Sequence, residues 1–142
     1  MTEVAFHFNV PDKLGYACRF LRKAYKSGSK VGVLGDADTL KALDKSLWTF
    51  SALDFVPHCA ISANSAVLSA TAIVLGTDAT RLPHDELLLH LGDSIPEGFE
   101  RFARVVELVS MDEADRAGAR LRWRHYADRG YALIRHDLAI KS

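Results

Sequence analysis

The chain has 142 residues and a mass of 15.7 kDa, the size of one ordinary domain. Hydrophobic residues make up 49% and charged residues 25%, a globular balance that excludes a disordered chain. Eighteen basic residues balance eighteen acidic ones, and a formal net charge of +0 argues against a protein that coats nucleic acid or a membrane surface. Two isolated cysteines, Cys18 and Cys59, and the lack of a leader or a spanning segment predict a soluble cytoplasmic protein.

The first strand and helix are predicted near the N-terminus. Residues 4–8 are rich in aromatic and β-branched side chains, which is typical of a strand. Asp12 can cap the helix that follows, because apolar residues recur at every third or fourth position over residues 13–27. Gly28 predicts the end of that helix, since glycine adopts the left-handed backbone at no steric cost.

A second strand and helix follow directly. Residues 30–34 predict a strand, and Asp36 or Asp38 can cap a helix that runs through residues 40–48. Either aspartate could also bind a metal, but capping explains both at lower cost. Irregular structure is expected over residues 50–58, which contain a proline.

The rest of the chain predicts strands at 70–75, 87–91, 104–109 and 131–137, with a short helix near Pro96. Ser110 and Glu113 form a capping-box pattern at the start of a last helix, which Gly130 ends. Alternating strands and helices predict an α/β fold: one domain over residues 1–142, with a layered, largely parallel sheet and helices on both faces.

The motifs of common catalytic sites are absent from the sequence. The strand–turn at Gly32–Gly35 lacks the glycine spacing of a dinucleotide site, and no P-loop or nucleophile elbow occurs. The adjacent His58 and Cys59 suit the two faces of a strand better than one metal ion. We therefore expect no catalytic residue, metal or cofactor. A nucleotide-binding module or small-molecule enzyme, with its ligand near Gly35 and Asp36, remains the alternative.

The last predicted helix carries a cluster of arginines around a tryptophan. Helical spacing places Arg116, Arg120, Trp123 and Arg124 on one face. The residues expected to face the core instead are Ala114, Ala117, Leu121 and His125.

Two classes of ligand, or a purely structural role, explain this cluster. Guanidinium groups can hold a carboxylate with two parallel hydrogen bonds, and the indole offers a flat apolar wall, so an acidic peptide ending in an aromatic residue would fit. Single-stranded nucleic acid would fit through phosphate contact and base stacking. A partly buried tryptophan with arginines that extend to solvent explains the pattern equally well.

Aromatic residues gather at a second place, around the turn that holds Trp48, Phe50 and Phe55. Exposed Trp and Phe side chains often anchor protein interfaces. Without further context, the pattern favours a small apolar cluster under a loop over an interface.

The sequence resembles the chi subunit of bacterial DNA polymerase III over nearly its whole length. The resemblance is carried by the segments Leu43-Asp-Lys-Ser-Leu-Trp48, Asp54-Phe-Val-Pro-His58, Phe99-Glu-Arg-Phe102, Val105-Val-Glu-Leu-Val109, Ala119-Arg-Leu-Arg-Trp-Arg124 and Tyr126 to Tyr131. It implies a non-catalytic subunit of a DNA-directed DNA polymerase complex, with an α/β fold like that of nucleotide-binding proteins. It also implies a replication adaptor that reaches DNA indirectly, and no membrane.

The resemblance further implies two partner sites. The psi subunit, which links chi to the clamp loader, or a helicase that competes with it, would bind near Trp48 and Phe55. The acidic tail of single-strand DNA-binding protein, which ends in Pro-Phe, would bind a pocket built from Val109, Arg120, Trp123 and Arg124. The family commonly has Tyr and Lys where this chain has Trp123 and Arg124, which keeps the chemistry but alters the shape of the pocket.

The zero net charge is the sum of two opposed regions. Residues 76–100 are acidic, whereas residues 116–135 carry six arginines and one acid. The last helix is therefore basic enough to hold an acidic tail, although the whole chain is not basic enough to coat DNA. Direct binding of DNA by this arginine-rich helix remains a third hypothesis.

Overall fold

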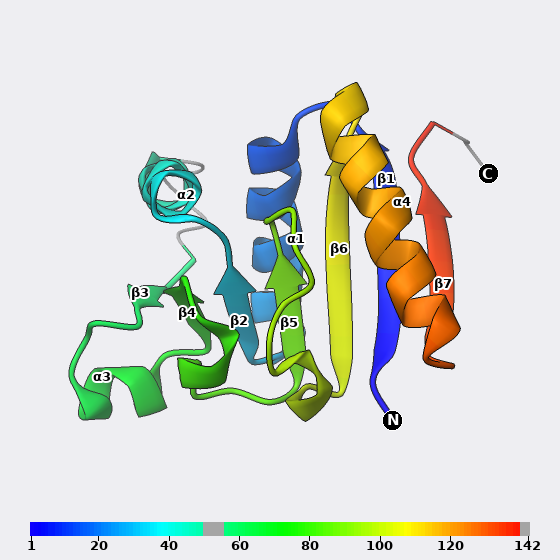
Figure 1. The fold of residues 1–142 in the computed structure, drawn as a ribbon. Helices are drawn as coiled ribbons and strands as arrows, with labels where there is room; N and C mark the ends of the chain where they lie inside the picture. The colour runs from blue at the N-terminus through cyan, green and yellow to red at the C-terminus, as the bar shows by residue number, and fades with distance from the viewer. Residues whose placement is uncertain (50–55, 140–142) are drawn as a thin grey trace.

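The structure, a computed structural model, describes residues 1–49 and 56–139, which form a seven-stranded sheet with every pairing parallel (Figure 1). The elements are β1 (Glu3–Val10), α1 (Lys13–Lys26), β2 (Val31–Leu34), α2 (Ala37–Thr49), β3 (Cys59–Ala60), α3 (Ser65–Ala70), β4 (Ile73–Gly76), the 3-10 turn η1 (Ala79–Arg81), β5 (Leu87–His90), the 3-10 turn η2 (Phe99–Arg101), β6 (Arg104–Ser110), α4 (Glu113–Asp128) and β7 (Ala132–Asp137). The strand order is β3-β4-β2-β5-β6-β1-β7. The predicted α/β class with a parallel sheet is confirmed.

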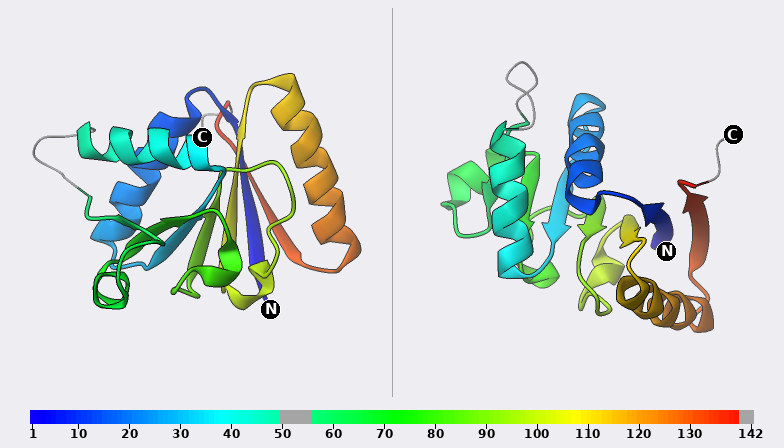
Figure 2. Two further views of the ribbon diagram at one scale, coloured as in Figure 1. Left: turned by 60° about the vertical axis from the view of Figure 1, so that its left-hand side comes forward. Right: turned by 90° about the horizontal axis from the view of Figure 1, so that it is seen from above.

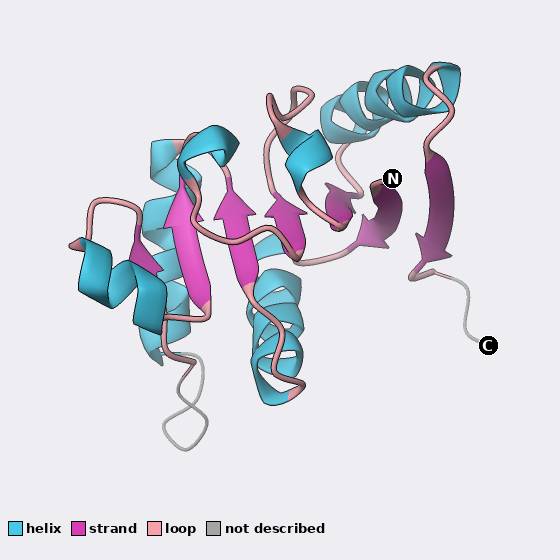
Figure 3. Ribbon diagram, turned by 90° about the horizontal axis from the view of Figure 1, so that it is seen from below, coloured by secondary structure: helices cyan, strands magenta, loops and turns pink. Residues whose placement is uncertain are grey.

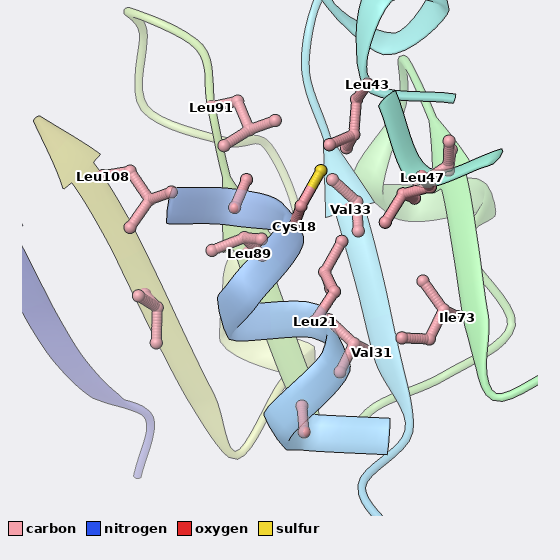
Figure 4. Close-up of a cluster of buried hydrophobic side chains, with 14 of the residues drawn as sticks. Cys18, Leu21, Val31, Val33, Leu43, Leu47, Ile73, Leu89, Leu91 and Leu108 are labelled. Carbon is pink, nitrogen blue, oxygen red and sulfur yellow. The ribbon is translucent and has the colours of Figure 1, made fainter. Parts of the chain in front are cut away.

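Helices cover both faces of the sheet, as predicted. Helices α1 and α2 lie on one face and α4 lies on the other (Figure 2). Each face has its own buried core, and the side chains of β6 alternate between them: Val106 and Leu108 join the core under α1 and α2, whereas Val105 and Val109 join the core under α4. Figure 4 shows the first of these cores, where Cys18 is packed as a small apolar side chain.

The predicted ends of the first two helices are also confirmed. The Asp12 carboxylate accepts a hydrogen bond from the Gly15 amide at 3.1 Å and caps α1. Gly28, just beyond the end of α1, has a φ of 82°. Asp36, and not Asp38, caps α2 by accepting from the Thr39 amide at 2.7 Å.

The region before β4 departs from the sequence prediction. The strand expected at 70–75 begins only at Ile73, because α3 extends to Ala70 under a cap in which the Asn64 side chain accepts from the Val67 amide. The two-residue strand β3 was not predicted, and Figure 3 shows it with α3 at the edge of the sheet opposite β7. The short helix expected near Pro96 is the 3-10 turn η2.

The start of α4 is a second correction. Asp112, not Ser110, caps the helix, by accepting a hydrogen bond from the Asp115 amide at 3.2 Å. Ser110 is the last residue of β6, and its amide donates to the Asp115 carboxylate at 2.7 Å. The capping box expected from the sequence is therefore not formed: the Asp115 carboxylate accepts from the Ser110 amide, and the amide of the cap residue Asp112 donates to the Ser110 hydroxyl at 3.3 Å.

The buried face of α4 is a third correction. The residues that face the sheet are Ala119, Arg122 and Tyr126, which recur at helical spacing. Leu121, expected in the core, is 66% exposed. Ala114 and Ala117 are exposed and His125 is only partly buried. An arginine takes the central core position because an acidic partner on β6 neutralises it.

No helix in the described part of the chain is long and apolar enough to cross a membrane.

Candidate functional site

A pocket of about 570 Å³ lies between α4 and the strands β6, β1 and β7. All four residues of the predicted tail site, Val109, Arg120, Trp123 and Arg124, line it. The other lining residues are Phe6, Phe8, Arg116, Ala119, Ala127 and Arg135. The structure thus brings the four predicted residues together, although Val109 comes from a strand and the other three from a helix.

The floor of the pocket is apolar and aromatic. Phe6 and Phe8 lie two residues apart on β1, so both side chains point to the α4 face of the sheet. The Trp123 ring packs edge-on against Phe6, with 5.2 Å between ring centroids. Trp123 is only partly buried, so one edge of the indole is anchored on the core while the side chain still lines the pocket.

The rim of the pocket is strongly basic. Arg116, Arg120, Arg124 and Arg135 line it, and its described lining contains no acidic residue. The Arg135 guanidinium lies over the Phe8 ring, 5.1 Å from the centroid. Guanidinium groups keep their charge at any ordinary pH, so the pocket presents permanent positive charge above an apolar floor.

One rim arginine already has a carboxylate partner. Arg120 donates to Oε1 of Glu113 from Nη2 at 3.0 Å and from Nη1 at 3.4 Å. The Arg120 side chain is 58% exposed and the Glu113 side chain 76% exposed, so water screens this ion pair. In the free protein, the Arg120 guanidinium is therefore already bound to a carboxylate, that of Glu113.

A buried polar network fixes α4 against the sheet behind the pocket. Glu107 on β6 is 0% exposed, and its carboxylate accepts hydrogen bonds from His90 Nδ1 at 2.7 Å, Arg122 Nε at 3.1 Å and the Tyr126 hydroxyl at 2.8 Å. Burial alone would raise the pKa of Glu107, but the charges and hydrogen bonds of His90, Arg122 and Tyr126 outweigh it and hold the pKa below the usual range. Arg122 and Tyr126 belong to α4, so the network sets the position of that helix and of its pocket residues.

Sequence reasoning missed five lining residues, of which Phe6, Phe8 and Arg135 supply aromatic or charged groups and Ala119 and Ala127 supply only small apolar surface. The alternation of Phe6 and Phe8 could have placed both on one face of the first strand. Nothing in the sequence indicates that this strand lies next to β7, from which Arg135 reaches the pocket.

The predicted partner surface lies on the other side of the molecule from α4 (Figure 1). Trp48, near the end of α2, is 61% exposed, and its ring packs edge-on against His58 at 5.6 Å between centroids. His58 is held in turn by the carbonyl of Val56 at 2.8 Å and the carboxylate of Asp44 at 2.7 Å. Phe55 lies outside the described residues.

The alternative nucleotide site near Gly35 and Asp36 has unsuitable chemistry. A second pocket does lie there, but five carboxylates and no arginine or lysine line its described part. Asp36 already satisfies the N-terminus of α2, where a phosphate would bind in a nucleotide-binding fold. Among the described residues, no group of three or more His, Cys, Asp and Glu side chains is placed to hold a metal ion.

Comparison with known proteins gives a consistent result. The sequence profile of the family described as "DNA polymerase III chi subunit, HolC" matches residues 1–134. The chain is 32% identical to DNA polymerase III subunit chi of Pseudomonas aeruginosa, over 97% of this chain and 98% of that protein. It is 26% identical to DNA polymerase III subunit chi of Haemophilus influenzae, over 82% of this chain and 81% of that protein. The chain therefore belongs to the chi-subunit family of DNA polymerase III.

Proposed function

We propose that this chi subunit is a non-catalytic adaptor that binds the acidic C-terminal tail of single-strand DNA-binding protein in the pocket beside α4. The single observation that carries the proposal is the composition of that pocket, with four arginines around a floor of Phe6, Phe8, Val109 and Trp123. Few classes of ligand can use both the basic rim and the apolar floor. A peptide that ends in Phe with a free carboxylate, and that has acidic residues upstream, uses the apolar floor and the basic rim together.

Each part of the tail has a partner of matching chemistry. The terminal Phe ring lies against Trp123 and Val109, where it gains both apolar burial and an aromatic contact. Arg120 and Arg124 bind the terminal carboxylate, and Arg116 and Arg135 lie close enough on the same rim to attract the upstream acids. Because few contacts are made and the charges are exposed, we expect a dissociation constant on the order of 10 µM that rises with salt.

Calorimetric titration of the purified protein with three tail peptides tests this proposal. Replacing the terminal Phe by Ala is expected to weaken binding roughly tenfold or more, because a buried Phe side chain contributes about 1.5–3 kcal/mol. Amidation of the terminal carboxylate is expected to weaken binding by about as much, through loss of charge-assisted hydrogen bonds worth about 1.5–3 kcal/mol. Equal affinity for all three peptides contradicts the proposal. Binding of single-stranded DNA by the protein alone at low salt, with no binding of the peptides, favours direct DNA binding instead.

Glu113 is expected to compete with the tail for Arg120. Glu113→Gln removes the carboxylate that occupies this guanidinium in the free protein, so peptide affinity should rise by about two- to fivefold, in line with the small free energy of an exposed ion pair. The same calorimetric titration measures it, with Glu97→Gln as a control that removes one charge outside the pocket. Equal gains in both variants would mean that net charge, not release of Arg120, sets the affinity.

We further propose that the surface around Trp48 binds the psi subunit or a competing helicase, and so connects chi to the clamp loader. A tryptophan that is 61% exposed, and whose ring packs edge-on against His58, is the type of residue that anchors an interface. Trp48→Ala is expected to reduce co-purification of psi at least about tenfold, the loss typical of an interface hot spot, while tail-peptide affinity stays unchanged. Loss of both activities would instead indicate damage to the fold.

A further inference from the structure

The second pocket of the molecule, of about 720 Å³, lies at the carboxyl ends of the strands. It is bounded by the turn after β2 and by the segment after β5. These strands are neighbours in the sheet, but the chain continues from β2 toward β3 and β4 and from β5 toward β6, in opposite directions. Parallel sheets bind their ligands at such a point of reversal, because the loops diverge and leave a crevice.

The crevice is acidic throughout its described lining. Asp36, Asp78, Asp93, Glu97 and Asp115 line it, without any arginine or lysine. Three of these carboxylates already have partners. Asp36 caps α2 and Asp78 caps η1. Asp115 accepts hydrogen bonds from Lys13 and from the Ser110 amide.

The other two carboxylates belong to Asp93 and Glu97, which are exposed. Within the described part of the chain, neither side chain accepts a hydrogen bond. Both are therefore able to bind a positively charged ligand.

A buried histidine at the base of the crevice supplies an observation independent of the acidic cluster. His90 is only 2% exposed, and its Nδ1 lies 2.7 Å from Glu107 Oε1. The Glu107 carboxylate can only accept, so Nδ1 of His90 donates in this hydrogen bond. In the neutral ring the lone pair then lies on Nε2. Among the described residues Nε2 has no hydrogen-bond partner.

The space in front of this nitrogen is kept open by a glycine. Gly92 and His90 both line the crevice, and a Cβ atom on Gly92 would lie 2.9 Å from Nε2. Any larger residue at this position would close off Nε2. Two carboxylates and, in the neutral ring, one imidazole nitrogen therefore face the crevice as hydrogen-bond acceptors, beside the hydroxyl groups of Thr77 and Ser94, which can accept as well as donate.

We propose that this crevice binds a small organic cation through a primary ammonium or guanidinium group. An N–H of the group donates to Nε2 of His90, and the carboxylates of Asp93 and Glu97 neutralise its charge. The volume is within the range of small-molecule sites. The site shares no lining residue with the pocket beside α4, and the proposal does not depend on the tail-binding function.

Agmatine, which carries one guanidinium and one primary ammonium group, is the probe for this site. Hexamethonium is the matched control, because it has the same charge of two but no N–H donor. The protein is labelled with ¹⁵N histidine, and the His90 Nε2 resonance is followed at pH 8, where an ordinary imidazole is neutral. We expect agmatine to shift this resonance with a dissociation constant on the order of 1 mM, and hexamethonium to bind at least about fivefold more weakly.

Three variants separate this site from general attraction of cations. Glu97→Gln is expected to weaken agmatine binding about three- to fivefold, whereas Glu113→Gln, which removes the same charge outside the crevice, leaves it unchanged. Gly92→Ala is expected to abolish the shift of Nε2 while the protein stays folded.

Equal binding of agmatine and hexamethonium, equal effects of the two glutamine variants, or an unchanged response in Gly92→Ala would each overturn the proposal. Tail-peptide binding measured on the same samples would still report the other pocket. A result that overturns cation binding in the crevice is therefore distinguishable from one that overturns tail binding in the pocket beside α4.

Discussion

Arg120→Ala is expected to weaken binding of the acidic tail peptide by roughly 10- to 100-fold, the loss of a charge-assisted pair worth about 1.5–3 kcal/mol. The fold should be unaffected, because the Arg120 side chain is 58% exposed and its hydrogen bonds go to Glu113, which is also exposed. Arg120→Lys should recover only part of the affinity, since an ammonium group cannot make two parallel bonds to a carboxylate. Calorimetric titration with the peptide measures both variants, and a thermal melt verifies that each is folded.

Arg129→Ala is the matched control for this experiment. Arg129 lies just beyond α4, is exposed and does not line the pocket, so the variant loses the same charge elsewhere. We expect its affinity to change by less than about twofold, because the charge of an exposed side chain outside the pocket is screened by water and salt. If Arg129→Ala weakens binding as much as Arg120→Ala, the tail is attracted by the overall charge of this region and the pocket is not its site.

Most helices and strands could be predicted from the sequence because their signals are local. The 3-4 spacing before Gly28, the caps at Asp12 and Asp36 and the short apolar strands each involve residues a few positions apart. The error on the buried face of α4 arose because a long-range contact decides which residues are buried. Arg122 is buried on α4 only because Glu107, 15 residues earlier on a strand, receives its hydrogen bond. A helical pattern that assigns Leu121 to the core cannot include such a partner.

The residues of the candidate site also fall into those that local patterns predict and those that they do not. Helical spacing predicted that Arg116, Arg120, Trp123 and Arg124 share a face, and the structure places all four on one pocket. The contribution of Val109 came from the family resemblance. The aromatic floor depends on β1 lying between β6 and β7, a strand order that no local pattern determines. The sequence could therefore predict the charged rim of this pocket but not its floor.

The buried network behind that pocket is expected to carry the largest effect on stability. Arg122→Leu should lower the free energy of unfolding by about 3–5 kcal/mol, because it leaves the Glu107 carboxylate buried without its cationic partner. Glu107→Leu should cost a similar amount, since Arg122 is then the unpaired charge at 2% exposure. Urea denaturation at pH 7 measures both, with Leu121→Ala as the exposed control on the same helix.

The double variant Glu107→Leu/Arg122→Leu distinguishes coupling from simple loss of packing. Removing both charges leaves no unpaired ion, so the double variant should be less destabilised than the sum of the two single variants.

The pH dependence of stability should change as well in the double variant. In the wild type the pKa of Glu107 is lowered by folding, so its stabilisation is present above the ordinary pKa of a carboxyl group and is lost as the pH falls through the lower, folded value. The double variant should therefore lose less stability than the wild type as the pH falls below the ordinary pKa of a carboxyl group. Additive single effects, or parallel acid titrations of the two proteins, would show that Glu107 and Arg122 contribute by packing and not as a coupled pair that fixes α4 on the sheet.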